Sequence, residues 1–523
     1  MSNSQTLREL EKRWNSSCKL IFNQEVGGLL EYEPWLMELT EPITYHKSNL
    51  SGKEVISAPT DYHSDSKWIA FDEVDFSQKF EPLEINEIKD IDSLVEAISE
   101  RWYYSGNIVF GKSGYIENSS NINDSFYIFK TARFGNSKYL SHCTIGRQNE
   151  DCFGCNAVDE SSHCIRCSRI HRNRRCFEVW MSQNTSDSYY SYGLNNCSNC
   201  IFSFNLKSRR YAIGNLVLEA SEYDAIKNKL LSEMAEELMK KKRLPSLIEL
   251  VEKSKVKVST VAVQNAPISK LNKSGIEDAF SKTTKVLFGK TLSGSIDDYA
   301  LWLTRHTRGV ETRFSAVNGQ ELFTASYANY PKLPRERLLN ADDAEGLGNR
   351  TSISKEDAQS LSLKNVHEKI GYLAFFNVEL LEGTNQNQIN CAVSIESSNC
   401  YRSSVTEYSK YCGYSFWPRN SQYLFGCDSP FDSNFSINCY SCTSLARCFE
   451  IDCCGYCSDC YFCHNCENVH DSMFCFNVKN LRNAIGNTPI SREKYQQTKT
   501  DLKNWIVEKL EQKKEVDLDV FSL

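Results

Sequence analysis

The stretch CFGCNAVDESSHCIRCSRIHRNRRCF (residues 152–177) contains a cysteine that recurs every twelve residues. Cys152, Cys164 and Cys176 form this row, and Cys155 and Cys167 form a second row three residues behind it. An α-helix does not explain the spacing, because twelve residues make about 3.3 turns and the row would drift around the helix axis. The repeat therefore indicates another kind of regular structure.

The same spacing returns nearer the C-terminus. Eight of the 23 cysteines lie between residues 143 and 200, fourteen lie between residues 391 and 475, and Cys18 stands alone. In the second group, twelve residues separate Cys400 from Cys412 and Cys448 from Cys460. Such clustering at a fixed period is typical of a repeat architecture.

The residues around the cysteines favour short strands and turns. Aromatic and β-branched runs such as FYIF (126–129) and CFEVW (176–180) alternate with Asn, Asp, Ser and Gly. A circuit of strands and turns of about 12 residues predicts one coil of a parallel β-solenoid, with equivalent residues stacked about 4.8 Å apart. Small Cys and Ser side chains would fill its narrow interior.

Both arrays end in the same way. FNLKSRRYAIGN (204–215) closes the first array and FNVKNLRNAIGN (476–487) closes the second, and an amphipathic helical pattern follows each. We expect each helix to pack over the open end of its array and cover the unpaired strand edge. The sequence thus indicates a duplicated unit of array plus capping helix.

The predicted fold class is mainly β with α: two cysteine-laddered parallel β-solenoid arrays, each followed by a capping helix, plus mixed α/β regions. The predicted boundaries are 1–90 for an N-terminal mixed region, 91–215 for the first array, 216–243 for its cap helix, 244–273 for a linker, 274–387 for a mixed α/β region of unassigned fold, 388–487 for the second array, and 488–523 for a C-terminal cap helix and tail.

Several segments resemble a known family. YHKSNLSGKEVIS (45–57) and SDSKWIAFDEVDFSQKF (64–80), together with the two array endings, are similar to an uncharacterised cysteine-rich repeat family common in small-genome candidate-phylum bacteria. The resemblance implies no activity. That family usually opens with a zinc-ribbon-like set of cysteines, whereas this chain has only Cys18 in that region.

Composition limits the classes of protein to consider. Hydrophobic residues make up 41% and charged residues 24% of the 523 residues, which is typical of a globular protein. The net charge of −7 argues against a basic protein that coats nucleic acid. The polar N-terminus MSNSQTLRELEKRW and the lack of 18 consecutive apolar residues predict a cytoplasmic chain with no signal peptide or membrane partner.

Two groups of cysteines have the spacing of metal ligands. Cys152, Cys155, Cys164 and Cys167 form a CxxC…CxxC pattern that could hold zinc in a tetrahedron of thiolates. The run CCGYCSDCYFCHNC is denser and offers zinc or iron–sulfur ligands at Cys454, Cys457, Cys460, Cys463, Cys466 and His464. The alternatives are that free thiols fill the array interior, which explains the twelve-residue rows, or that they form disulfide ladders.

A basic segment and a glycine-rich segment complete the candidates. Arg166, Arg169, Arg172, Arg174 and Arg175 predict a patch for an anion, a nucleic acid or an acidic partner, or else a solvated face. GNIVFGKS (106–113) matches the phosphate-loop pattern formally, but its strand-like middle and the β-array after it argue against that function.

The sequence favours a non-catalytic structural or interaction protein, such as a subunit of a large assembly or particle shell that contacts protein partners or copies of itself. The alternatives are a thiolate protein that binds zinc or iron–sulfur, and a nucleic-acid-associated factor that uses the arginine patch. No cofactor other than zinc or iron–sulfur is suggested, and no nucleophile with a local base is evident.

Overall fold

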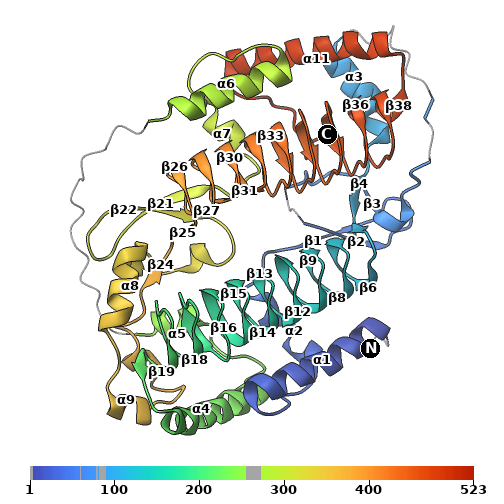
Figure 1. Cartoon of the computed structure of the whole chain (residues 1–523). Coiled ribbons are helices and arrows are strands. Elements are labelled where there is room, and N and C mark those ends of the chain that lie inside the picture. The colour runs from blue at the N-terminus through green and yellow to red at the C-terminus, as the bar shows by residue number, and fades with distance from the viewer. Residues whose placement is uncertain (1–3, 59–60, 78–79, 82–89, 255–271) are drawn as a thin grey trace.

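The computed structural model describes residues 4–58, 61–77, 80–81, 90–254 and 272–523. Parallel strands with flanking helices make up most of it, so the predicted mainly β fold with helices is confirmed (Figure 1). Residues 255–271 of the predicted linker, and residues 82–89 of the predicted N-terminal region, lie outside the described residues. No helix in the described part of the chain has both the length and the apolar character needed to span a membrane.

The elements fall into two halves, each with leading elements, an array of strands and a following helix. The leading elements of the first half are α1 (Gln5–Phe22), η1 (Leu29–Tyr32), α2 (Glu33–Met37), β1 (Thr44–Lys47), β2 (Glu54–Ser57), β3 (Trp68–Ala70), η2 (Phe71–Glu73), α3 (Ile91–Ile98), η4 (Ser99–Arg101) and β4 (Tyr104–Gly106).

The first array, with the two helices that follow it, consists of β5 (Val109–Phe110), β6 (Gly114–Glu117), β7 (Ser120–Asn123), β8 (Phe126–Phe129), β9 (Ala132–Gly135), β10 (Lys138–Ser141), β11 (Thr144–Arg147), β12 (Glu150–Phe153), β13 (Asn156–Asp159), β14 (Ser162–Ile165), β15 (Ser168–His171), β16 (Arg174–Gln183), β17 (Tyr189–Tyr192), β18 (Ser198–Ile201), β19 (Arg210–Ile213), β20 (Leu216–Val217), α4 (Ala220–Lys241) and α5 (Leu247–Glu252).

The leading elements of the second half are α6 (Ser274–Phe288), η5 (Ile296–Tyr299), α7 (Ala300–Leu303), β21 (Val310–Phe314), β22 (Glu321–Ala325), η6 (Tyr330–Lys332), η7 (Arg335–Arg337), β23 (Leu338–Leu339), α8 (Ala341–Arg350), α9 (Lys355–Gln359), α10 (Val366–Lys369) and β24 (Phe376–Asn377).

The second array and its helix are β25 (Leu380–Glu382), β26 (Gln386–Ile389), β27 (Val393–Ile395), β28 (Ser398–Tyr401), β29 (Val405–Glu407), β30 (Lys410–Gly413), β31 (Phe416–Arg419), β32 (Gln422–Phe425), β33 (Asn434–Tyr440), β34 (Phe449–Asp452), β35 (Tyr461–His464), β36 (His470–Met473), β37 (Arg482–Ile485), β38 (Thr488–Pro489) and α11 (Arg492–Lys513).

Most strands of each array pair in parallel with a twelve-residue register. Cys152 pairs with Cys164, and Cys164 pairs with Cys176. In the second array Ile451 pairs with Cys463 in the same way. Each array ends in an antiparallel hairpin, β19–β20 in the first and β37–β38 in the second. The cysteine rows found in the sequence are therefore rows of cross-strand neighbours.

A second, shorter period underlies the first. Every third residue from position 115 to position 214, and again from position 408 to position 486, has a positive φ. Such left-handed residues are uncommon outside glycine. Each cysteine of the arrays except Cys453 directly follows one of them. The CxxC spacing therefore corresponds to one three-residue step of the backbone.

The cysteines inside the arrays are hydrogen-bonded to the backbone. The Cys155 thiol donates to the Phe153 and Cys164 carbonyls at 3.6 and 3.4 Å, and the Cys155 N–H donates to the Cys143 sulfur at 3.5 Å. Ser137 occupies an equivalent position, donates to the Gly135 carbonyl at 2.8 Å and accepts from the Asn149 N–H at 3.0 Å. Cys and Ser therefore interchange because both fill space and connect successive strands.

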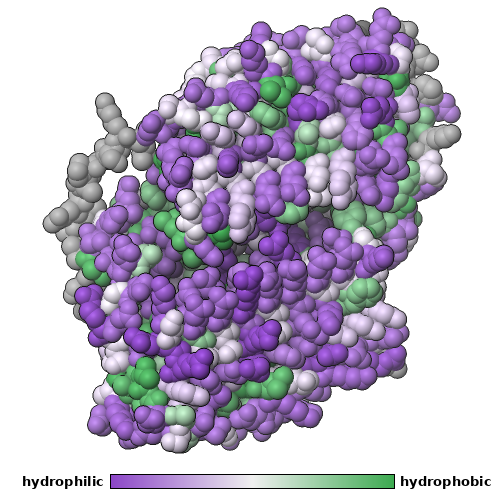
Figure 2. Space-filling view, viewed as in Figure 1, coloured by the Kyte–Doolittle hydropathy of each residue, from purple (hydrophilic) through white to green (hydrophobic). Residues whose placement is uncertain are grey.

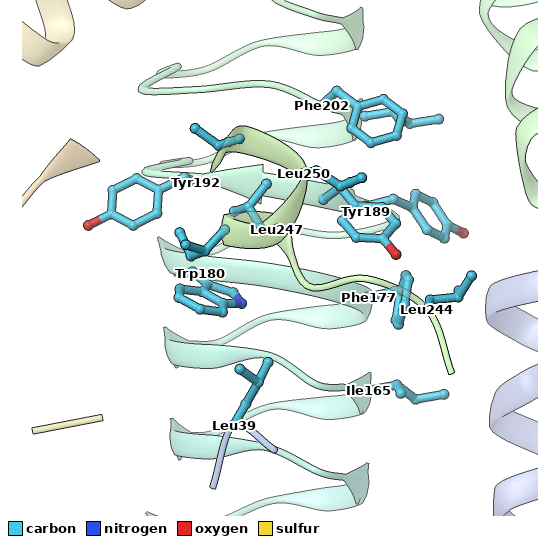
Figure 3. Close-up of a cluster of buried hydrophobic side chains, with 14 of the residues drawn as sticks. Leu39, Ile165, Phe177, Trp180, Tyr189, Tyr192, Phe202, Leu244, Leu247 and Leu250 are labelled. Carbon is cyan, nitrogen blue, oxygen red and sulfur yellow. The ribbon is translucent and has the colours of Figure 1, made fainter. Parts of the chain in front are cut away.

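Large side chains cover the outside of each array. In Figure 3, Phe177, Trp180 and Tyr189 project from the strands of the first array toward Leu247 and Leu250 of α5. All five are at most 2% exposed and belong to one hydrophobic cluster, which α1 and α4 complete.

The two halves repeat the same plan, including the region 274–387 whose fold the sequence left unassigned. Tyr32, Trp35 and Leu36 in the first half have the same spacing and burial as Tyr299, Trp302 and Leu303 in the second. Leu36 packs against Gly154, and Leu303 packs against Gly426, in their respective arrays. The duplicated unit is therefore longer than an array and its helix.

The end of each array is covered by the other half of the chain. At the end of the first array, the Ile353 N–H donates to the Gly214 carbonyl at 2.9 Å. At the end of the second, the Arg101 side chain donates to the Gly486 carbonyl at 3.0 Å. The arrays run in opposite directions, and α4 lies in line with α1 along the side of its array rather than over its end (Figure 1). The predicted cap helices α4 and α11 contact the last parallel strands β19 and β37, and the other half of the chain adds the contacts at the array ends.

Candidate functional site

The predicted zinc quartet lies inside the first array. Cys152, Cys155, Cys164 and Cys167 are at most 1% exposed, and each thiol donates to backbone carbonyls. Burial raises the pKa values of Cys152, Cys164 and Cys167, which disfavours the thiolate form that metals bind. Burial also acts to raise the pKa of Cys155, but hydrogen bonds with Cys143, Cys152 and Cys167 outweigh it and lower that pKa. The structure places the four side by side in rows.

The dense segment is arranged in the same way. Cys454, Cys457, Cys460, Cys463 and Cys466 are at most 3% exposed, and each donates to two backbone carbonyls of the second array. Within the described residues, no group of three or more His, Cys, Asp or Glu side chains converges so that it could hold a metal ion. Metal binding by these residues stays a prediction.

His464 belongs to a buried polar network apart from the thiols. Its Nδ1 lies 2.8 Å from Asp452 Oδ2, which also accepts from the Tyr62 hydroxyl at 2.6 Å. Its Nε2 accepts from the Ser105 backbone N–H at 2.9 Å. Ser105, His464 and Asp452 have the residue types of a catalytic triad, but the contact uses the serine backbone instead of its hydroxyl. The network joins the first half to the second array.

The five arginines of the basic segment do not form one surface, which corrects that prediction. Arg166 is 0% exposed, donates from Nε to Glu178 Oε1 at 2.7 Å, and donates from Nη1 to the Trp35 carbonyl. Arg172 pairs with Glu160 at 2.8 Å, and Arg175 pairs with Asp187 at 2.6 Å. Arg169 faces Asn329, Tyr330 and Leu333 of the second half across a small cavity, while Arg174 is exposed. Acidic residues twelve positions away neutralise three of the five.

The glycine-rich segment 106–113 does not have the context of a phosphate loop. It runs through β5 and leads into the strand β6, whereas a phosphate loop leads into a helix whose N-terminus faces the phosphates. The strand in the middle of the segment and the β-array after it lie where the sequence predicted them.

A polar cavity lies between the two arrays. Its volume is about 330 Å³, and it takes its walls from both halves. Figure 2 shows the face between the halves hollowed and bordered by hydrophilic residues. The lining residues are Glu41, Pro42, Ala58, Asp61, Ala132, Arg133, Thr144, Ile145, Arg305, His306, Thr307, Arg308, Ser326, Tyr327, Ala328, Asp428, Tyr440, Ser441 and Phe521.

Two arginines of the cavity are paired with acids. Arg308 donates to both oxygens of Asp428 at 3.0 and 2.9 Å and to Glu41 at 2.8 Å. Arg305 donates to Glu515 at 3.0 Å and to Asp519 at 3.3 Å. Burial raises the pKa of Asp428 to about 6 although Arg308 opposes the shift. Arg308 links the two halves, because Glu41 belongs to the first.

His306 is held in its charged form. Its Nε2 lies 3.2 Å from Asp519 Oδ2, and its Nδ1 lies 3.8 Å from Asp61 Oδ1. Burial lowers the pKa of His306, but the contacts with Asp519 and Asp61 outweigh it and raise the pKa to about 9. Nearby, burial raises the pKa of Glu450 to about 8, and Asp519 adds to that shift. His306 in the cavity and Glu450 nearby therefore titrate in the neutral and weakly alkaline range.

The cavity was missed in the sequence because its residues come from distant segments. Residues 305–308 lie in the region whose fold was unassigned, and they show no spacing that relates them to residues 132–145. One signal was available. Arg133 has Asn121 and Ile145 twelve residues away instead of an acid. Comparisons with known proteins add no identity: no family model, no curated protein and no solved structure matches this chain.

Proposed function

We propose that the chain is a non-catalytic structural or interaction protein built on two β-solenoids. The twelve-residue parallel register and the left-handed residue in every third position support the solenoid interpretation, because they return the chain to an equivalent position after four three-residue sides. Stacked coils of this kind expose long, repetitive faces that suit contact with other macromolecules.

The observation that carries the proposal is the use of the thiols. The array cysteines that would give the chain metal or redox chemistry point inward and are hydrogen-bonded to the backbone, where serine serves equally well. Charged residues on the outside form pairs at the same twelve-residue step, such as Lys138 with Glu150 and Arg447 with Asp459. Both features favour a rigid structural role over a reactive site.

Exchange of Cys and Ser within one row tests this role. Cys460→Ser should lower the free energy of unfolding by only about 1 kcal/mol, because the hydroxyl can bond the same Ser458 and Val469 carbonyls as the thiol. The reverse exchange Ser472→Cys, one strand further along the row, is the matched control and should be equally mild. Urea unfolding followed by circular dichroism measures both.

The metal-binding alternative has a different outcome. If thiolates hold zinc or iron–sulfur, elemental analysis of protein purified without added metal should find near-stoichiometric metal, and Cys460→Ser should release it with a loss of several kcal/mol. That combination would overturn the proposal.

Concentration-dependent sedimentation of the full chain tests the self-assembly part, and a monomer at all concentrations would contradict self-assembly. The pairing of three of the five arginines within the chain disfavours the nucleic-acid alternative.

A further inference from the structure

We propose that the cavity between the arrays is a binding site for a small oxyanion, a carboxylate or a phosphate group, held by the guanidinium of Arg133. This site is independent of the structural function proposed above. It rests on an unpaired charge, on the pattern of pairing elsewhere in the arrays, and on the space available.

Arg133 is the unpaired charge. It lines the cavity from β9, and its Nε and Nη1 atoms are buried without a hydrogen-bond partner among the described residues. A buried donor without a partner loses its hydration and gains nothing in return. The guanidinium fork matches the two oxygens of a carboxylate or phosphate, which would satisfy both nitrogens at once.

Several arginines of the arrays pair with an acid at the twelve-residue step. Arg175 meets Asp187 and Arg447 meets Asp459 in this way. Arg133 departs from this pattern, because its neighbours at that step are Asn121 and Ile145. Substitution of an acid at either position would have neutralised Arg133 within the array. The counter-charge is therefore expected from outside the array.

The other cations at the cavity already have acids. Arg308 is matched by Asp428 and Glu41, and Arg305 is matched by Glu515 and Asp519. His306 lies between Asp519 and Asp61. Among the described cationic residues that line the cavity, Arg133 is therefore the one without an acidic partner.

The space beside Arg133 is large enough for a ligand. A volume of 330 Å³ is at the lower end of the range for small-molecule sites. Arg169 offers an internal comparison, because its Nε and Nη2 are also buried and unpartnered, yet the cavity beside it measures only about 10 Å³. A cavity of that size holds a water molecule at most. Of these two described sites, the Arg133 site combines unpartnered guanidinium nitrogens with room for an organic anion.

Thermal unfolding and calorimetry of the full chain test the site. Phosphate, acetate and citrate are titrated against sodium chloride at equal ionic strength, and the melting temperature is measured, since a ligand of the native state raises it. We expect a saturable rise with at least one of the three anions. Arg133→Met should weaken binding at least tenfold. Arg172→Met, which removes an exposed arginine of the same array, should leave binding unchanged.

The outcomes are distinguishable even if Arg133→Met folds poorly. Arg133→Lys keeps the charge and loses the fork, and isothermal titration at 25 °C should then show binding weakened but retained. A response to phosphate alone assigns a phosphate ligand, and a response to acetate or citrate assigns a carboxylate. The proposal is overturned if no anion acts beyond the chloride control, or if both arginine variants bind as the unmodified chain does.

Discussion

Replacement of Arg166 by methionine is expected to lower the free energy of unfolding by about 3–5 kcal/mol, because it leaves a buried carboxylate without its partner. Arg166 and Glu178 are both 0% exposed, and their side chains meet at 2.7 Å one twelve-residue step apart. Arg166 also stacks on Trp35, with 4.7 Å between the guanidinium carbon and the ring centre. Burial already raises the pKa of Glu178, and Arg166 is the main group opposing that shift.

A double-mutant cycle measures this interaction. Arg166→Met combined with Glu178→Gln should recover much of the loss, since the amide can still accept from the Leu247 N–H, which lies 3.1 Å from Glu178. Arg172→Met is the control, because Arg172 is exposed and little change in stability is expected from it. Urea unfolding at neutral pH measures the free energy of unfolding of Arg166→Met, of the double variant and of Arg172→Met. A loss below about 1 kcal/mol for Arg166→Met would show that the charge is solvated.

The second large effect is a loss of stability as the pH rises from 6.5 to 9. The pKa of His306 is raised to about 9 in the folded chain, against an ordinary value of 6.5. Folded His306 therefore keeps a proton that the unfolded chain has released. Its contribution is complete below pH 6.5 and disappears as the pH rises through 9, and such a shift corresponds to about 3 kcal/mol.

Two carboxyl groups act in the same direction. The pKa of Glu450 is about 8 in the folded chain, whereas its ordinary value in the unfolded chain is 4.5. The folded chain therefore holds this proton at pH values where the unfolded chain has released it. Asp428, with a pKa of about 6, behaves alike at lower pH. His306→Gln should therefore reduce the fall in stability between pH 6.5 and 9, and the remaining fall is due to Glu450, whose pKa His306 lowers in the unmodified chain. Denaturation curves at pH 6.5, 8 and 9 measure it.

His367→Gln is the control for this experiment. His367 is a partly exposed histidine on α10, 3.9 Å from Glu368 and far in sequence from the cavity. Its replacement should leave the pH dependence as it is in the unmodified chain. If His306→Gln and His367→Gln change the slope equally, His306 is not the group responsible.

The sequence predicted the arrays well because their contacts are periodic. Cys152, Cys164 and Cys176 became cross-strand neighbours as their spacing indicated. The three-residue step was also present in the CxxC spacing, which the sequence left open between metal ligands, thiols that fill the array interior and disulfides. The left-handed residues that directly precede the cysteines include Arg166 and Arg175. Arginine rarely adopts this conformation, so the residue type does not predict it. Their conformation becomes evident only in the backbone.

The sequence was less informative about the segments between the arrays. The match of Tyr32, Trp35 and Leu36 with Tyr299, Trp302 and Leu303 is visible in the chain, yet it spans few residues and passed unnoticed beside the cysteines. The covering of each array by the opposite half could not be predicted, because Ile353 and Arg101 reach their partners across more than 130 residues.

By itself, the sequence determined which residues stack on one another within an array, since neighbours at a constant separation share one local geometry and one steric demand for small inward side chains. Only the tertiary structure decided how the two arrays meet. Contacts such as Arg308 with Glu41, and the cavity beside Arg133, depend on the relative placement of segments that no periodicity connects. That placement arises from the burial of many weak, aperiodic apolar contacts, which no single motif records.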